Sequence, residues 1–216
     1  MEENKYINRQ ISVYKTSRRL IEFIDKLKPA SVYNYAKIHS GTDEKWNGHK
    51  LISCVGVRIG DYSVKPAQYS EANISPDDVR ILYSLAYKNY LGKPKYMTYL
   101  KEEKIMPVAG ENGRSKVTKL TIVRQEKDSK DRIRRLPVVI AIEDGTGILK
   151  KTATGGNCCA SGSYQRENMH FINMSDKDFY IQLSHVNQFL NAWELTNEAL
   201  LIREARKKKE ETIHAS

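Results

Sequence analysis

The sequence predicts an α+β fold in which amphipathic helices pack on one face of antiparallel β-sheet. Two apolar, β-branched segments, Val117–Val123 and Leu136–Ile142, are typical of neighbouring strands of one hairpin. Two further segments each begin with a serine that is followed three residues later by an aspartate, which is typical of a helix N-terminus. Both helix starts follow extended segments, and together these patterns predict a strands-then-helix unit that occurs twice.

The first helix is expected to run from the cap residue Ser75 to Leu91. Pro76 suits the first helical position, and Gly92 follows the last one. The second helix is expected from Ser175 to about Arg206. Its predicted inner face consists of apolar residues at helical spacing: Phe179, Leu183, Val186, Leu190 and Trp193.

Periodicity also predicts a helix over Lys15–Lys28, because its apolar residues fall on one helical face and Pro29 follows. Leu51–Ile59 has the composition of a strand, and Tyr62–Ala72 is expected to be extended. Residues 93–114 are expected to be a connector, with a short helix around Tyr96–Glu103. Later in the chain we expect a hairpin turn at Asp144-Gly145, a third strand from Gly147 to Thr152 and an extended segment from Ser163 to Asn173.

These elements divide the chain into five parts. An N-terminal helical element (1–48) precedes a first strands-plus-helix unit (49–92). The connector (93–114) leads to a second unit (115–206), and a basic flexible tail (207–216) ends the chain.

The two capped helix starts match beyond their caps. Five identities occur in one gapless register with an offset of 100 residues, at Asn73/Asn173, Ser75/Ser175, Asp78/Asp178, Ile81/Ile181 and Ser84/Ser184. The capping pattern alone accounts for two of them, and the other three favour duplication.

A duplicated unit of antiparallel strands closed by one amphipathic helix resembles the PUR and Whirly families of single-stranded nucleic-acid binders. The resemblance covers Lys50–Gly92 and Lys116 to about Arg206. It is one of topology, without a family motif. It implies curved sheets whose outer faces carry basic and aromatic residues.

The composition favours a polyanionic partner. The chain has 216 residues, and 36 Lys and Arg against 26 Asp and Glu give a net charge of +10. Cations that neutralise phosphates release counterions, which favours binding to nucleic acid. No apolar run approaches the roughly 20 residues that span a bilayer, and the first residues lack a signal-peptide pattern, so we expect a cytoplasmic protein without a membrane partner. Cys54, Cys158 and Cys159 show no metal-binding spacing and are expected to be reduced, and neither a metal nor another cofactor is expected.

The strongest charge feature is the basic segment between the two strands of the predicted hairpin. If the strands extend through it, alternate side chains form a ridge that contacts phosphates: Arg124, Lys127, Lys130, Arg132, Arg134 and Arg135. The alternative is a solvated hairpin tip. Lys150 and Lys151, before a glycine-rich loop, are further candidates for phosphate contacts, and that segment is otherwise a plain hairpin loop. Three tyrosines outside helices are expected to stack on bases: Tyr62, Tyr69 and Tyr164.

These features predict a non-enzymatic protein that binds single-stranded DNA or RNA, with no assigned catalytic residue. The expected partner is nucleic acid or a nucleoprotein complex, and a homodimer is left open. One alternative is a phage or mobile-element inhibitor or adaptor that docks on a nucleoprotein, as anti-CRISPR proteins do. The other is a metal-dependent nuclease, for which the chain offers four carboxylates and two candidate general bases: Asp128, Asp131, Glu143, Asp144, His170 and His185.

Overall fold

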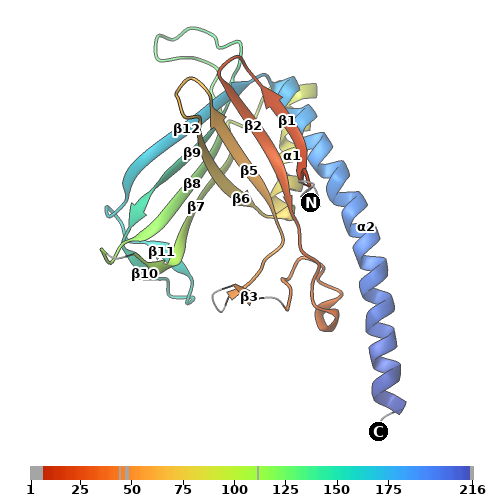
Figure 1. Ribbon diagram of the computed structural model, residues 1–216. Coiled ribbons are helices and arrows are strands. Elements are labelled where there is room, and N and C mark those ends of the chain that lie inside the picture. Colours follow the sequence, from red (N-terminus) through yellow and green to blue (C-terminus); the bar gives the residue numbers. More distant parts are fainter. Residues whose placement is uncertain (1–6, 44, 47–48, 111, 215–216) are drawn as a thin grey trace, which may run out of the picture.

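The computed structural model describes residues 7–43, 45–46, 49–110 and 112–214, which form two four-stranded antiparallel sheets and two long helices (Figure 1). The first sheet has the order β1-β2-β5-β6 and consists of β1 (Gln10–Lys15), β2 (Arg19–Lys26), β5 (Cys54–Asp61) and β6 (Gln68–Ile74). The second has the order β12-β9-β8-β7 and consists of β7 (Thr98–Ala109), β8 (Ser115–Arg124), β9 (Val138–Gly147) and β12 (Gln165–Met174). In each sheet, therefore, the spatial order of the strands follows the chain.

Short elements lie in the connections between strands of these sheets. The turn η1 (Val32–Asn34) and the two-stranded pair β3 (Lys45–Trp46) and β4 (His49–Lys50) lie between β2 and β5. A second small hairpin lies between β9 and β12 and is formed by β10 (Leu149–Lys151) and β11 (Asn157–Cys159).

A helix follows each sheet, as the capping patterns predict. In α1 (Pro76–Leu91) the Ser75 hydroxyl accepts a hydrogen bond from the Asp78 amide at 3.0 Å, and α2 (Asp176–His214) begins with the same bond between Ser175 and Asp178, also at 3.0 Å. The helix α2 continues beyond the predicted end at Arg206, and the predicted flexible tail is helical as far as residue 214. Residues 207–211 in this part of the helix are all Lys or Glu, which are strong helix formers. Figure 1 shows this C-terminal half of α2 extending away from the sheets.

One apolar core joins the two sheets and both helices. The inner faces of β5 and β9 supply fully buried β-branched residues at alternating positions, among them Val57, Ile59 and Ile140. The two helices pack on each other and on this core, while β6 contacts β9 and β12 contacts β5. Among the described residues, no helix is both long and apolar enough to cross a bilayer.

The predicted helix over Lys15–Lys28 is wrong, because this segment forms the hairpin of β1 and β2. Ile21 and Phe23 point into the core, and Leu20 and Ile24, on the opposite face of the strand, are also buried. Apolar residues on both faces of a strand produce a spacing that also fits one face of a helix. The N-terminal part therefore supplies half of the first sheet, and a domain boundary at residue 49 divides that sheet.

Two further predictions are wrong around the second sheet. Tyr96–Glu103 is not a helix, because most of it belongs to β7, which pairs with β8 and adds residues 98–109 to the second unit. Asp144-Gly145 is not a turn either, since both residues pair with β8 on one side and β12 on the other. At Gly145 a Cβ atom would lie 2.1 Å from the carbonyl oxygen of Gln165, so the close approach of β12 requires glycine.

Candidate nucleic-acid interface

Three loops meet at one end of the molecule, the upper end in Figure 1. The turn between β1 and β2 contacts the β5–β6 hairpin, since the Tyr62 amide donates to the carbonyl oxygen of Arg18 at 2.8 Å and Arg19 Nε lies 2.9 Å from Asp61 Oδ2. The same turn borders a shallow pocket that Leu136, at the base of the β8–β9 loop, also lines.

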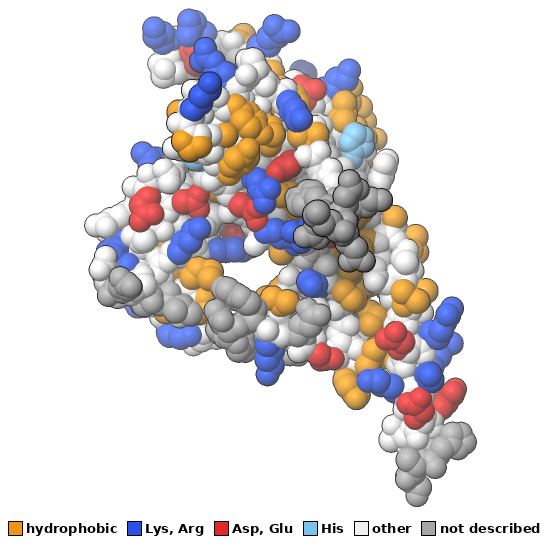
Figure 2. All heavy atoms as spheres, in the orientation of Figure 1, with side chains coloured by type: hydrophobic (Ala, Val, Ile, Leu, Met, Phe, Trp, Pro, Cys, Tyr) orange, Lys and Arg blue, Asp and Glu red, His pale blue; other side chains and the backbone are white. Residues whose placement is uncertain are grey.

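We call this surface the basic end. Its three loops, together with the strand-end residues that flank them, carry ten Lys and Arg residues against four carboxylates, namely Lys15, Arg18, Arg19, Lys65, Arg124, Lys127, Lys130, Arg132, Arg134 and Arg135 against Asp61, Glu126, Asp128 and Asp131. Figure 2 shows Lys and Arg side chains gathered at this end. The basic end therefore carries an excess of six positive charges, and the net charge of the whole chain is +10.

The loop between β8 and β9 is a compact tip and not an extension of the two strands. One bridge pairs Lys127 with Ile133. The Asp128 carboxylate accepts hydrogen bonds from the amides of Lys130 and Arg132 at 2.8 and 3.0 Å and from the Arg132 guanidinium at 2.6 and 2.8 Å. These bonds, above all those from the guanidinium, lower the pKa of Asp128. The carboxylate thus organises the tip as a turn.

The six cations predicted for the ridge differ in their availability. The side chain of Arg124 is only 10% exposed, and its guanidinium is paired with Asp176 at 3.0 Å and with Glu126 at 2.6 Å. Arg124 therefore stabilises the fold and is not available to a phosphate.

The other five lie on the tip. Lys127 pairs with Asp131 at 2.9 Å, Arg132 pairs with Asp128, and Arg134 Nε donates to the carbonyl oxygen of Lys127 at 3.1 Å. In the described part of the chain, the charged groups of Lys130 and Arg135 have no hydrogen-bond or ion-pair partner. These two are the free cations of the tip.

Two of the predicted tyrosines lie beside these loops. Tyr62 and Tyr69 are exposed and meet edge to face with ring centroids 6.0 Å apart. The Tyr69 ring lies against Gly60, where a Cβ atom would come within 2.8 Å of it. The hydrogen bond between the two tyrosine hydroxyls, whose oxygens are 3.5 Å apart, and partial desolvation raise the pKa of Tyr62 to about 12.

The remaining predicted residues lie at the opposite end of the second sheet. The ten residues of β9 separate the β8–β9 loop from the β10–β11 hairpin by about 30 Å. Lys150 and Lys151 lie on that hairpin, where Lys151 Nζ donates to Asn157 Oδ1 at 2.7 Å. Tyr164 is covered there as well, because Lys119 Nζ lies 3.8 Å from its ring centroid and its ring edge approaches Gly145.

Burial, and then the nearby Glu143 carboxylate, raise the pKa of Tyr164 to about 12. The structure therefore does not bring Lys150, Lys151 and Tyr164 together with the basic end.

Several residues of the basic end were missed by sequence reasoning. Lys15, Arg18 and Arg19 lie at the turn between β1 and β2, within the segment predicted as a helix. The Arg19 guanidinium lies 4.1 Å from the ring centroid of Phe171 and donates to its carbonyl oxygen at 3.0 Å. The pair Thr16-Ser17, between two β-branched and aromatic segments, is the signal that could have indicated this turn.

The carboxylates of the nuclease alternative do not converge. Asp128 and Asp131 lie on the tip, whereas Glu143 and Asp144 project from opposite faces of β9, Glu143 toward Tyr164 and Asp144 toward the first sheet. Over the described ranges, no group of three or more His, Cys, Asp or Glu side chains is arranged to hold a metal ion.

One of the two candidate general bases, His170, belongs to a hydrogen-bond network between the two sheets. Buried His170 lies with Nδ1 2.8 Å from the Ser70 hydroxyl, and Ser70 donates to Asp144 at 2.5 Å. Because the hydroxyl has one hydrogen, His170 is the donor to Ser70. These bonds join β6 of the first sheet to β9 and β12 of the second. The other candidate, His185, lies exposed on α2.

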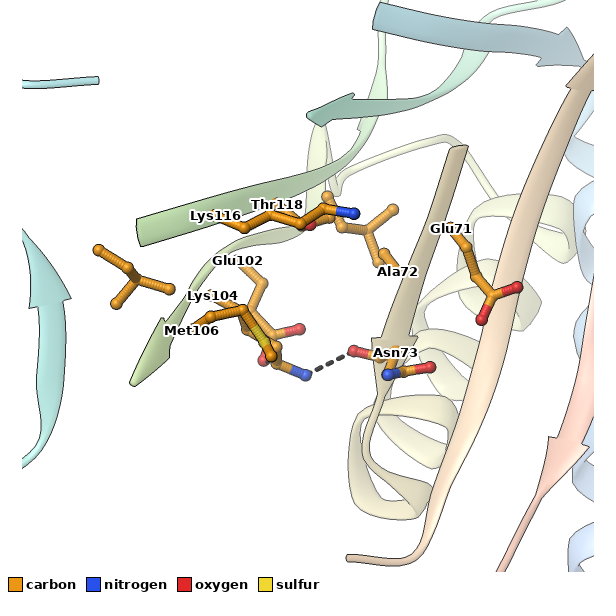
Figure 3. A pocket seen from close by; sticks show the side chains of 10 residues that line it. Glu71, Ala72, Asn73, Glu102, Lys104, Met106, Lys116 and Thr118 are labelled. Atoms are coloured by element: carbon orange, nitrogen blue, oxygen red, sulfur yellow. Dashed lines mark hydrogen bonds and ion pairs between the residues drawn. The ribbon is translucent and has the colours of Figure 1, made fainter. Parts of the chain in front are cut away.

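A cavity of about 270 Å³ lies between β6 and the inner face of β7 and β8 (Figure 3). Lys104 donates to the backbone carbonyl oxygen of Asn73 and pairs with Glu102 at 3.0 Å, and Lys116 projects into the same space. Both signs of charge line the cavity, which lies along the half of β8 that is remote from the tip.

Comparison with protein-family models, with curated proteins and with solved structures gave no match to this chain.

Proposed function

We propose that this protein binds single-stranded DNA or RNA at the basic end, without cleaving it. The observation that carries the proposal is the convergence of three loops that together carry an excess of cations beside two exposed tyrosines. Lys130 and Arg135 contact phosphates directly, while Tyr62 and Tyr69 offer ring surface to the bases.

The charge of this end suits a sequence-independent contact with the phosphate backbone. Neutralising phosphates releases condensed counterions, so affinity rises with the number of contacts and falls with salt. The ion pairs at the tip are exposed, with side-chain exposures of 56% for Lys127 and 71% for Arg132. Exposed pairs contribute little free energy, about 0–1 kcal/mol, so phosphates can compete with Asp131 and Asp128 for these cations.

The tyrosines favour an unpaired strand over a duplex. A base presents its flat face to a side chain only where it is not stacked inside a double helix, and each such contact contributes about 1–3 kcal/mol. Tyr62 and Tyr69 lie on the outer face of the first sheet at the β5–β6 hairpin, next to the β1–β2 turn. A strand whose phosphates contact these loops therefore passes within reach of the rings.

We also propose that the two units arose by duplication. Each has four antiparallel strands in chain order followed by a helix with the same serine cap, and β6 and β12 make reciprocal contacts with the third strand of the other sheet. Ser70 and His170, which are equivalent at the offset of 100 residues, contact each other, as residues near a pseudo-two-fold axis do. This arrangement supports the resemblance to the PUR and Whirly families.

The second candidate is an adaptor or inhibitor that docks on a nucleoprotein. The part of α2 beyond Trp193 favours it, because this helix extends from the sheets and exposes Leu195 and Ile202, which lie seven residues apart on one helical face. Exposed apolar side chains on one helix are typical of a protein-docking surface. Retardation of purified nucleic acid distinguishes the two functions, since only the first predicts it.

The decisive experiment is the salt dependence of binding. Fluorescence anisotropy with labelled single-stranded DNA and RNA gives the slope of log K against log salt for the wild type and for the double variant Lys130→Gln/Arg135→Gln. Loss of two phosphate contacts flattens the slope by roughly 1.4, at about 0.7 per contact on single strands. Thermal stability stays unchanged, because exposed cations contribute little to folding.

The matched control is Lys150→Gln/Lys151→Gln, which removes the same charge at the far end of the second sheet and leaves the slope as in the wild type. Equal slopes for the wild type and for Lys130→Gln/Arg135→Gln would refute binding at the tip. Cleavage of the labelled strands in Mg²⁺ would refute the non-enzymatic part of the proposal.

A further inference from the structure

Ile133 lies on the tip, and its side chain is 87% exposed, more than any other large apolar side chain among the described residues. Single exposed apolar residues are common on protein surfaces. The position of this one is unusual, because between Glu126 and Arg135 every other side chain except that of Ser129 is charged. Five of them are cationic: Lys127, Lys130, Arg132, Arg134 and Arg135.

The backbone around Ile133 is well fixed. Ile133 forms a β-bridge with Lys127. On either side of it, the Arg134 amide donates to the carbonyl oxygen of Glu126 at 2.8 Å, and the Asp128 amide donates to the carbonyl oxygen of Arg132 at 2.9 Å. The Asp128 carboxylate closes the turn from within. A β-branched side chain has few rotamers, so Ile133 is held in water with little freedom to fold back onto the protein.

The surroundings of Ile133 determine what can cover it. The cations of the loop attract a polyanion, and the bridge places Lys127 on the same face as Ile133. In a nucleic acid the phosphates contact the cations, and the apolar surface that remains for Ile133 is the face of a base. Some proteins that bind duplex DNA insert apolar side chains between neighbouring base steps and unstack them, and the bases of an unpaired strand offer the same kind of contact.

We propose that Ile133 is a wedge that inserts between two successive bases of the bound strand. Separating stacked bases costs less in an unpaired strand than in a duplex, where pairing is strained as well. Ile133 thus contributes to selection of single strands over duplex. The inference rests on the proposed function, because the wedge acts only on a strand held by the basic end.

The test uses single-stranded oligonucleotides with 2-aminopurine at successive positions, since this base becomes more fluorescent when it is unstacked. Saturating wild-type protein should raise the fluorescence. With Ile133→Ala the rise should disappear at saturation, and binding should weaken roughly ten-fold, as expected for partial burial of the deleted methyl and methylene groups. The salt slope should stay as in the wild type, because no cation is lost.

Ile52→Ala is the matched control. It makes the same chemical change at a residue that is 69% exposed in the segment before β5, and it should behave as the wild type in both assays. Binding to a duplex of the same sequence should be affected by Ile133→Ala less than three-fold, so the variant loses preference for single strands.

An undiminished fluorescence rise with Ile133→Ala would overturn the wedge, as would an equal loss of affinity for single strand and duplex. Both results leave the proposed function intact, provided that Lys130→Gln/Arg135→Gln still flattens the salt slope. If that slope does not change, the proposed function fails, and the wedge fails with it.

Discussion

Replacing Arg124 by Gln should destabilise the fold strongly. The salt dependence of nucleic-acid binding should stay as in the wild type. The Arg124 guanidinium donates from Nε to both Asp176 oxygens at 3.0 and 3.2 Å and from Nη2 to Oδ2 at 3.2 Å. The two side chains are 10% and 20% exposed, and Asp176 lies in the first turn of α2, where a negative charge is also favoured by the helix dipole.

The expected magnitude lies between two limits. Removing one partner of a fully buried ion pair costs about 3–5 kcal/mol, and an exposed pair contributes about 0–1 kcal/mol. The small residual exposure places this pair nearer the buried limit, at about 2–3 kcal/mol. For a chain of this length, that loss lowers Tm by roughly 5–10 °C.

Urea unfolding followed by circular dichroism measures the loss, and a double-mutant cycle with Asp176→Asn isolates the coupling between the two side chains. A destabilisation below about 1 kcal/mol would show that the pair behaves as an exposed one. A salt slope that flattens by about 0.7 in Arg124→Gln would show that this guanidinium contacts a phosphate after all.

Two other stability predictions follow from local geometry. Ser75→Ala and Ser175→Ala should each cost about 1 kcal/mol in urea unfolding, because each removes the hydroxyl that accepts a hydrogen bond from the amide of the third helical residue, Asp78 or Asp178. Ser84→Ala, away from the caps, should cost less. Hydrogen bonds from Ser63, and then the Arg19 guanidinium, lower the pKa of Asp61 to about 2, below its value in the unfolded chain. The stability that Asp61 contributes is therefore present above about pH 4 and is lost as the pH falls from 4 toward 2, and Asp61→Asn should remove this part of the pH dependence of unfolding.

The helices and the strands of the β8–β9 pair could be predicted from the sequence because their signals are local. The caps at Ser75 and Ser175 are hydrogen bonds between residues three apart, and they form wherever these residues occur before an amphipathic segment. The hairpin of β1 and β2 could not be predicted in this way. Its apolar spacing fits a helix as well as a strand buried on both faces, and only the pairing of Ile21 with Ile59 distinguishes the two.

For the candidate site, too, local features could be predicted from the sequence, whereas the placement of the side chains could not. The charge of +10 and the cationic segment around Arg132 are properties of the sequence and predict a polyanionic partner. Arg124 and Arg135 are the same type of residue, yet Arg124 is enclosed with Asp176, 52 residues further along the chain, and Arg135 is exposed on the tip. Likewise, the sequence does not reveal that Arg18 and Tyr62 meet near the tip while Lys150 lies about 30 Å away. Which cations share a surface is decided by strand order and register, because these set the end of a sheet at which each loop emerges.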